Sequence, residues 1–216
     1  MSCTFPENMT FKMKIAAVTI TYNRLELTKK TVESFYQKTN VDYHLFVDNG
    51  STDGTQDWLK SRFDHIFLDQ NYGITEAFKT AVERLTDYDF ILKLDNDIET
   101  VTDDILNKML KFYELNGMKY VCSPVDLNLD PNFAPHSSGK GMLNGYHVSY
   151  VSHTGGAFQL IPIDICIKLM EDYRNFKLGD QAIGGFYKTQ GYKPVYLLDL
   201  EMKHIGLNQS SSNYIL

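Results

Sequence analysis

The first half of the chain alternates short apolar runs with longer stretches whose apolar residues recur at helical spacing. The short runs predict buried strands, and the longer stretches predict helices. The predicted strands span residues 15–20, 44–47, 66–68, 90–94 and 120–123, and the predicted helices lie around residues 25–36, 53–59, 77–85 and 105–115. This alternation is typical of βαβ units, so we expect an α/β fold with a mostly parallel central sheet flanked by helices.

The pattern weakens after Ser123. Residues 136–145 are rich in Ser and Gly and indicate a flexible loop, and the polar tail from Gly206 is predicted to be mobile. The remaining predicted elements are strands at 148–151, 157–161 and 195–200 and a helix at 178–189. The second half therefore predicts fewer regular elements than the first.

Composition narrows the class of protein. The 216 residues, 43% of them hydrophobic, fit one folded domain or one domain with an added lobe. A net charge of −6 argues against a large nucleic-acid footprint. Cys3, Cys122 and Cys166 show no metal-binding spacing, which favours a reduced, cytoplasmic compartment. No apolar run reaches the length of a membrane span, so at most we expect association with a membrane surface.

Two acids, Asp95 and Asp97, directly follow the predicted strand at 90–94. In an extended chain, residues two apart point the same way, and ligands of open α/β sheets bind at this edge. Oxygen-only ligands of this kind suit small divalent cations. The pair therefore predicts a site for Mg²⁺ or Mn²⁺, which bridge to substrate phosphates. Lys93, within the same strand, has no role that the pattern explains.

Further polar loops follow the other predicted strands. Right-handed crossovers place the loops after parallel strands at one edge of the sheet. Tyr22, Asp48, Asn71 and Asp95 each follow a different strand, so we expect them to line one crevice. Asp53 has Gln56 three residues later, which predicts a capping box at the start of a helix.

These loops, taken in order, resemble glycosyltransferase family 2, whose members have the nucleotide-sugar-binding GT-A fold. The motifs are Thr21-Tyr22-Asn23-Arg24, Asp48 to Gly54, Asn71-Tyr72-Gly73, Asp95-Asn96-Asp97, Gly155 to Phe158, Gly179-Asp180-Gln181 and His204-Ile205-Gly206. The second motif is similar to that of bacterial surface-polysaccharide transferases, including rhamnosyltransferase-like members. The resemblance implies a single GT-A domain over 1–216, with a nucleotide-sugar-binding half (about 1–99) and a smaller acceptor-binding half (about 100–216).

The resemblance also implies a role for each motif. The implied donor-binding residues are Thr21, Tyr22, Asn23, Arg24, Asp48, Asn49, Asn71, Gly73, Asp95 and Asn96. The implied metal ligands are Asp97, Asp95 and His204, with Mn²⁺ or Mg²⁺ as the ion; Gly155 and Gly156 would bind the acceptor, and Asp180 would be the catalytic base. Gly179 stands where many relatives carry an acid beside the catalytic base. Asn49 stands where many carry an acid that reads the nucleotide base, which leaves UDP, dTDP and GDP open as the donor nucleotide.

The function expected from this resemblance is metal-dependent, inverting transfer of a sugar from a nucleotide-diphosphate sugar to a hydroxyl of a glycan or lipid-linked saccharide. The expected location is the cytoplasm, with the inner face of the membrane as an open alternative. Two other functions also stay open: a non-catalytic sugar- or nucleotide-sugar-binding module, and the same chemistry on a modified nucleic acid. A nucleotidyltransferase is disfavoured, because residues 21–24 lack the glycines that such enzymes carry there.

Overall fold

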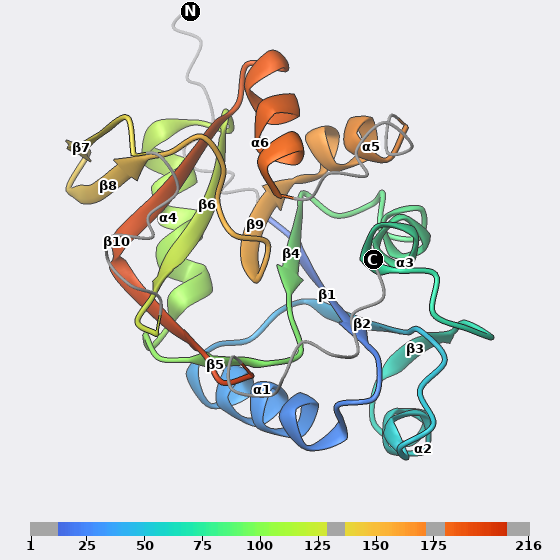
Figure 1. Cartoon of the computed structure of the whole chain (residues 1–216). Helices are drawn as coiled ribbons and strands as arrows, with labels where there is room; N and C mark the ends of the chain where they lie inside the picture. The colour runs from blue at the N-terminus through green and yellow to red at the C-terminus, as the bar shows by residue number, and fades with distance from the viewer. Residues whose placement is uncertain (1–12, 129–136, 172–179, 207–216) are drawn as a thin grey trace, which may run out of the picture.

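A computed structural model describes residues 13–128, 137–171 and 180–206. The strands in these ranges join in one ten-stranded sheet with helices on both faces (Figure 1). The strands are β1 (Ile15–Thr21), β2 (Tyr43–Asp48), β3 (Asp64–Phe67), β4 (Phe90–Leu94), β5 (Ile98–Thr100), β6 (Tyr120–Asp126), β7 (Gly139–Leu143), β8 (Tyr146–Tyr150), β9 (Phe158–Pro162) and β10 (Lys193–His204). The helices are α1 (Leu25–Lys38), α2 (Thr55–Lys60), α3 (Ile74–Val82), α4 (Ile105–Asn116), α5 (Ile163–Glu171) and α6 (Asp180–Thr189).

The sheet has the strand order β3-β2-β1-β4-β9-β6-β10-β8-β7, and β5 pairs with β10. The strands β3, β2, β1 and β4 are parallel, as the alternating pattern predicts. Beyond β4 the sheet is mixed: β9 runs antiparallel to both β4 and β6, while β6 and β10 are parallel. The α/β prediction is confirmed, and the parallel character belongs mainly to the first half of the chain.

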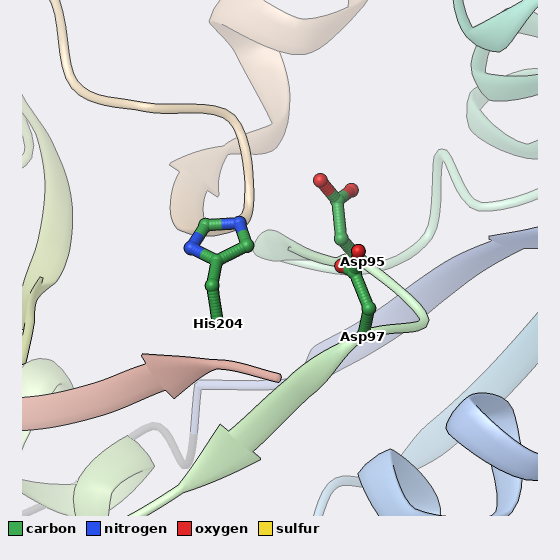
Figure 2. Close-up of side chains that lie close together, drawn as sticks. All are labelled: Asp95, Asp97 and His204. Carbon is green, nitrogen blue, oxygen red and sulfur yellow. The ribbon is translucent and has the colours of Figure 1, made fainter. Parts of the chain in front are cut away.

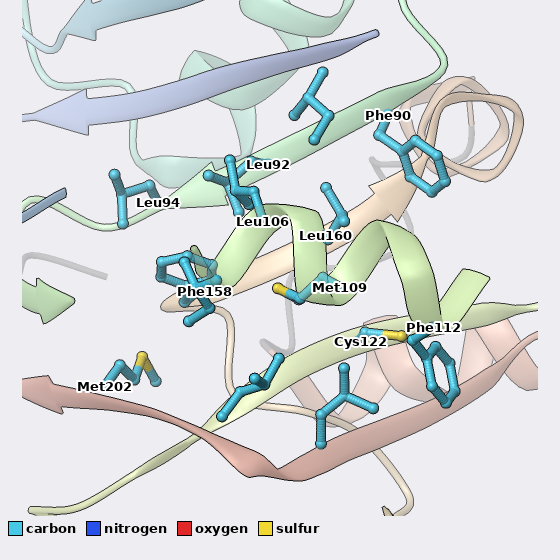
Figure 3. Close-up of a cluster of buried hydrophobic side chains, with 14 of the residues drawn as sticks. Phe90, Leu92, Leu94, Leu106, Met109, Phe112, Cys122, Phe158, Leu160 and Met202 are labelled. Carbon is cyan, nitrogen blue, oxygen red and sulfur yellow. The ribbon is translucent and has the colours of Figure 1, made fainter. Parts of the chain in front are cut away.

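Helices cover the sheet on two sides, and each side encloses a core. One cluster joins the sheet to α1 and α4, and the other joins it to α3, α5 and α6. The central strand β4 contributes to both: Leu92 and Leu94 pack in the first cluster (Figure 3), and Ile91 packs in the second. Burial on both faces explains why this strand reads as a nearly continuous apolar run rather than an alternating one.

The predicted flexible loop at 136–145 is wrong over most of its length. Residue 136 lies outside the described residues, but 139–143 form β7, which pairs antiparallel with β8. The connection is Asn144-Gly145, and both residues have positive φ, 43° and 90°. This is the backbone that a tight hairpin turn requires, and Asn-Gly is the sequence that most readily adopts it. The sequence did not predict this hairpin, because β7 is rich in glycine and, being exposed, shows little of the apolar pattern that predicts a strand.

The predicted capping box at Asp53 and Gln56 is also wrong. Gly54 is the N-cap of α2, with φ of 93° and no side-chain cap. Gln56 donates instead to Asp48 Oδ1 at 2.9 Å. Asp53 Oδ1 accepts from the amide of Thr55, the first residue of α2, at 3.1 Å, and Asp53 Oδ2 accepts from the amide of Leu25, the first residue of α1, at 2.8 Å. The carboxylate therefore supports the start of both helices, without the reciprocal bond from Gln56 that a capping box requires.

Two remaining expectations concern the whole chain. Cys122 and Cys166 are buried free thiols, and Cys3 lies outside the described residues. Within the described ranges, none of the helices combines the length and apolarity needed to cross a bilayer. The predicted mobile tail falls almost wholly on residues 207–216, which also lie outside the description.

Candidate metal and nucleotide-sugar site

The loops after β1 and β2 meet at the carboxyl edge of the sheet. Thr21 and Asp48 are register partners, and Thr21 Oγ1 donates to Asp48 Oδ2 at 2.7 Å. Asp48 is fully buried and also accepts from the Ser51 amide at 2.8 Å, from Ser51 Oγ at 2.5 Å and from Gln56. Its oxygens are thus engaged within the protein, where they fix the shape of the loop after β2.

The loop after β3 is tied to the same place through Asn49. Its amide nitrogen donates to the Gly73 carbonyl at 3.2 Å, and its amide oxygen accepts from the Tyr72 backbone at 3.3 Å. Asn71 Oδ1 accepts from the Gly73 amide at 2.9 Å, and Gly73 has φ of 85°, so this turn suits glycine. Asn49 and Asn71 therefore set the conformation of the loop after β3, in which Tyr72 is 47% exposed.

The loop after β1 carries the other predicted donor residues. Tyr22 is partly exposed, and Asn23, with φ of 49°, accepts from the Thr52 amide at 2.8 Å. Arg24 Nη1 lies 2.7 Å from Asp97 Oδ2, although the two residues are 73 positions apart in the sequence. These contacts confirm that the loops after β1, β2, β3 and β4 lie together at one edge of the sheet. The prediction that Asp48 lines a crevice is wrong, because this residue is fully buried.

Asp95 and Asp97 lie close together, but not for the reason that the sequence suggests. The chain turns at residues 96 and 97 instead of staying extended, and β5 begins directly afterwards. Helix α1 holds this turn: Thr28 Oγ1 accepts from Asn96 at 3.3 Å, and Thr31 Oγ1 accepts from the Ile98 amide at 2.9 Å. Asn96 therefore points to α1 and acts as part of the scaffold of the turn.

His204, at the end of β10, completes the cluster. Ligand atoms of Asp95, Asp97 and His204 lie within 4.8 Å of one another, and the three side chains converge in Figure 2. The strand β10 extends four residues beyond its predicted end at residue 200, and pairing with β5 places His204 opposite Ile98. The extension of β10 thus brings a distant residue to the acidic turn.

Asp126, at the end of β6, orients the imidazole. It is hydrogen-bonded to His204 Nδ1 and accepts from the His204 amide at 3.1 Å. The other ring nitrogen faces the two acids in Figure 2. Burial alone would lower the pKa of His204, but the hydrogen bond and charge of Asp126 outweigh it and raise the pKa above its ordinary value. A carboxylate that fixes a histidine in this way is typical of metal sites.

The electrostatics of the cluster also favour a cation. Burial raises the pKa of Asp97 above the ordinary carboxyl value, and the charge of Asp95 raises it further, while His204 and Arg24 oppose this shift. A carboxylate whose charge is destabilised by burial and by a neighbouring acid gains from a divalent cation placed beside it. The two carboxylates and the oriented imidazole therefore fit an ion such as Mn²⁺.

Gly206 packs directly against this cluster. A Cβ at this position would lie 2.4 Å from Asp97 Oδ2, and the neighbouring Ile205 amide donates to the Asp97 carbonyl at 2.8 Å. We expect Gly206→Ala to displace the Asp97 carboxylate and to weaken Mn²⁺ binding about tenfold, the lower range for disturbing a metal ligand. Calorimetric titration with Mn²⁺ measures the change.

Gly185→Ala is the matched control, because a Cβ there meets nothing within 4 Å. The control should bind Mn²⁺ as the unmodified chain does. Equal Mn²⁺ affinity in Gly206→Ala would show that Asp97 is not held by this contact.

The predicted acceptor-side residues lie across the same edge. Gly155 donates its amide to Tyr196 Oη at 2.8 Å, and the Gly156 carbonyl accepts from Lys93 Nζ at 2.5 Å. Asp180 is the first residue of α6; its side chain lies outside the description, as does Gly179. The assignment of Asp180 as a base therefore stays a prediction.

Sequence reasoning missed Asp126 and assigned no role to Lys93. Asp126 is the last residue of β6. The apolar pattern predicts that this strand stops at Ser123, because Pro124 and Asp126 interrupt the apolar run. The rule that polar residues at the carboxyl ends of neighbouring strands gather at one edge is the signal that finds Asp126, once β6 is given its full length.

Solved structures give the same architecture. The mannosyltransferase PcManGT from Pyrobaculum calidifontis, in complex with GDP-Man and Mn²⁺, has a TM-score of 0.69 at 15% identity over 93% of this chain. TarS 1-349 from S. aureus with UDP-GlcNAc has a TM-score of 0.65 at 15% identity over 92%. GalNAc-T7 with UDP, GalNAc and Mn²⁺ has a TM-score of 0.65 at 10% identity over 89%. The chain spans only 59%, 62% and 44% of these three chains, respectively.

Comparison with curated proteins gives no match. The sequence model of the family described as Glycosyl transferase family 2 matches residues 16–161, well over half of the chain. The match covers the loops after β1 to β4 and the loop that carries Gly155 and Gly156. On this match and the mixed α/β architecture, the chain belongs to glycosyl transferase family 2.

Proposed function

We propose that this chain transfers a sugar from a nucleotide-diphosphate sugar to an acceptor hydroxyl, with a divalent cation held by Asp95, Asp97 and His204. The observation that carries the proposal is the convergence of these three side chains at the edge where the loops after β1, β2 and β3 also gather. The complexes of similar structures with GDP-Man and with UDP-GlcNAc support a donor of this class.

When bound, the cation supplies positive charge to the diphosphate that leaves the sugar. His204 favours Mn²⁺ over Mg²⁺, because Mg²⁺ prefers oxygen ligands alone. Arg24 engages Asp97. We infer that its guanidinium also faces the diphosphate, since a planar guanidinium pairs well with phosphate oxygens.

The nucleoside would lie against the loops after β1, β2 and β3. Asp48 and Asn49 contribute by holding these loops in shape, since their polar atoms bond within the protein. Tyr22 and the exposed ring of Tyr72 are the side chains that we place beside the base. In this arrangement, backbone groups and stacking on the two tyrosine rings would select the nucleotide base.

We place the acceptor at Gly155 and Gly156 and assign the removal of its proton to Asp180. Attack from the side opposite the leaving diphosphate inverts the anomeric centre. A glycan or a lipid-linked saccharide is the acceptor class that we propose, in a cytoplasmic setting that includes the inner face of a membrane. The rhamnosyltransferase-like subtype and the division into a donor half and an acceptor half stay predictions of the sequence.

A thermal-shift screen tests the proposal. The chain is melted with Mn²⁺ and each of UDP-GlcNAc, UDP-glucose, GDP-mannose and dTDP-rhamnose, because a ligand that binds only the folded state raises the melting temperature. We expect one nucleotide class to stabilise the chain in the presence of Mn²⁺ and not with EDTA. Release of nucleotide diphosphate from that donor then reports turnover. No stabilisation by any donor rejects the proposal, and stabilisation without turnover, with or without acceptor, favours a binding module.

A further inference from the structure

Lys93 is a charged residue in the middle of the sheet. It lies in β4, with Val18 of β1 and Gln159 of β9 as its register partners on either side. Its side chain is only 13% exposed. An ammonium group held away from water in this way is costly unless charged or polar partners surround it.

The partners of Lys93 come from two different parts of the site. Its Nζ lies 2.5 Å from Asp95 Oδ1, in the metal cluster. The same Nζ lies 2.5 Å from the carbonyl oxygen of Gly156, in the loop that we place beside the acceptor. One ammonium group therefore joins the first acid of the metal cluster to the acceptor-side loop.

Other side chains hold residues 154 and 155 of the acceptor-side loop. Gln159 donates to Thr154 Oγ1 at 2.6 Å and to the Thr154 carbonyl at 3.1 Å. Tyr196 Oη accepts from the Gly155 amide. Residues 154 and 155 are thus held by β9 and β10, and Lys93 links the next residue, Gly156, to the metal cluster.

We propose that Lys93 is a positioning residue for sugar transfer, which sets the distance between the metal-bound donor and the acceptor loop by bridging Asp95 and Gly156. This inference rests on the proposed function. Because Lys93 occupies Oδ1, Asp95 presents its remaining oxygen to the cation or the donor. The positive charge of Lys93 also lowers the affinity of the cluster for a cation. In this proposal Lys93 therefore fixes the distance between donor and acceptor loop while it weakens metal binding.

The Lys93→Met variant separates these effects. Methionine fills similar space without the charge, so the electrostatic repulsion of the cation is removed. We expect Mn²⁺ alone to bind about tenfold more tightly by calorimetry. We expect the Gly155 amide to exchange with solvent faster by NMR, because its neighbour Gly156 loses the contact with Lys93, while the Ala157 carbonyl keeps its hydrogen bond from the Asp95 amide. Turnover of the donor identified in the screen should fall while its KM changes little.

Two further variants keep the test decisive. Lys38→Met removes a lysine from a similar pair with Asp103 at the far end of α1, and it should change none of these readouts. Lys93→Arg retains the charge but not the compact ammonium, so it should keep the Mn²⁺ affinity of the unmodified chain while slowing turnover.

The outcomes distinguish this inference from the proposed function. If the unmodified chain binds no Mn²⁺, the metal site itself is wrong. If it binds Mn²⁺, but Lys93→Met is folded and shows unchanged or weaker Mn²⁺ affinity with unchanged Gly155 exchange, the role of Lys93 is overturned and the metal site stands. A Lys93→Met chain that does not fold is replaced by Lys93→Arg, whose unchanged turnover would equally overturn the inference.

Discussion

The Asp97→Asn chain should bind Mn²⁺ at least about a hundredfold more weakly than the unmodified chain, a loss of about 2.7 kcal/mol. Asparagine keeps the shape of the side chain but removes the charge that the cation requires. The substitution also removes the ion pair between Asp97 and Arg24, whose side chain is only 16% exposed beside this partly buried cluster. The positive charge of Arg24, which Asp97 no longer balances, repels the cation further. Donor turnover should disappear with the metal, because the leaving diphosphate then lacks the cation that balances its charge.

Calorimetry with Mn²⁺, followed by release of nucleotide diphosphate, measures both effects. Asp103→Asn is the matched control, since Asp103 pairs with Lys38 at 2.7 Å on the exposed surface and lies outside the cluster. Thermal melts of both variants establish that each is folded. Equal Mn²⁺ affinity in a folded Asp97→Asn chain would remove the metal site from the proposal.

The position of Asp95 and Asp97 after β4 could be predicted from sequence because its information is local, whereas the turn between them could not, because distant residues of α1 hold it. The strand at 90–94 was expected with the bounds that β4 has, and both acids follow it directly. The gathering of the loops after β1, β2 and β3 follows from the parallel order of these strands, which the alternation of strands and helices predicts. Local pattern and chain topology together therefore place Asp95, Asp97 and the surrounding loops.

The remainder of the site depends on pairing between distant segments, which local pattern does not report. His204 reaches the acids because β10 continues past its apolar part and pairs with β5, a short strand that the pattern does not show. Asp126 orients His204 from 78 residues away. The sequence offers no reason for the charge of Lys93 in a buried strand. In the structure its Nζ contacts Asp95 and the Gly156 carbonyl, which are distant from each other in the sequence. His204 was placed by family resemblance, and its geometry emerges only in the folded chain.

The Asp180→Asn chain should keep its affinity for the donor and lose transfer by about 10²–10⁴-fold, which is the usual contribution of a positioned general base. The acceptor hydroxyl holds its proton strongly at neutral pH, so attack on the sugar requires a group that takes the proton as the bond forms. An amide has nearly the same size as the carboxyl group but does not accept this proton. In the proposed function the donor binds at the metal cluster and the loops after β1 to β3, none of which includes Asp180.

The measurement pairs calorimetry of the donor in the presence of Mn²⁺ with the rate of transfer to an acceptor saccharide. Asp57→Asn is a suitable control, because Asp57 pairs with Lys60 on the surface of α2 and should affect neither quantity. Loss of donor binding in Asp180→Asn, with unchanged turnover at saturating donor, would assign Asp180 to the donor side. Loss of turnover alone in Asp180→Asn, combined with loss of Mn²⁺ binding in Asp97→Asn, would assign the two acids to different steps, proton removal for Asp180 and metal binding for Asp97.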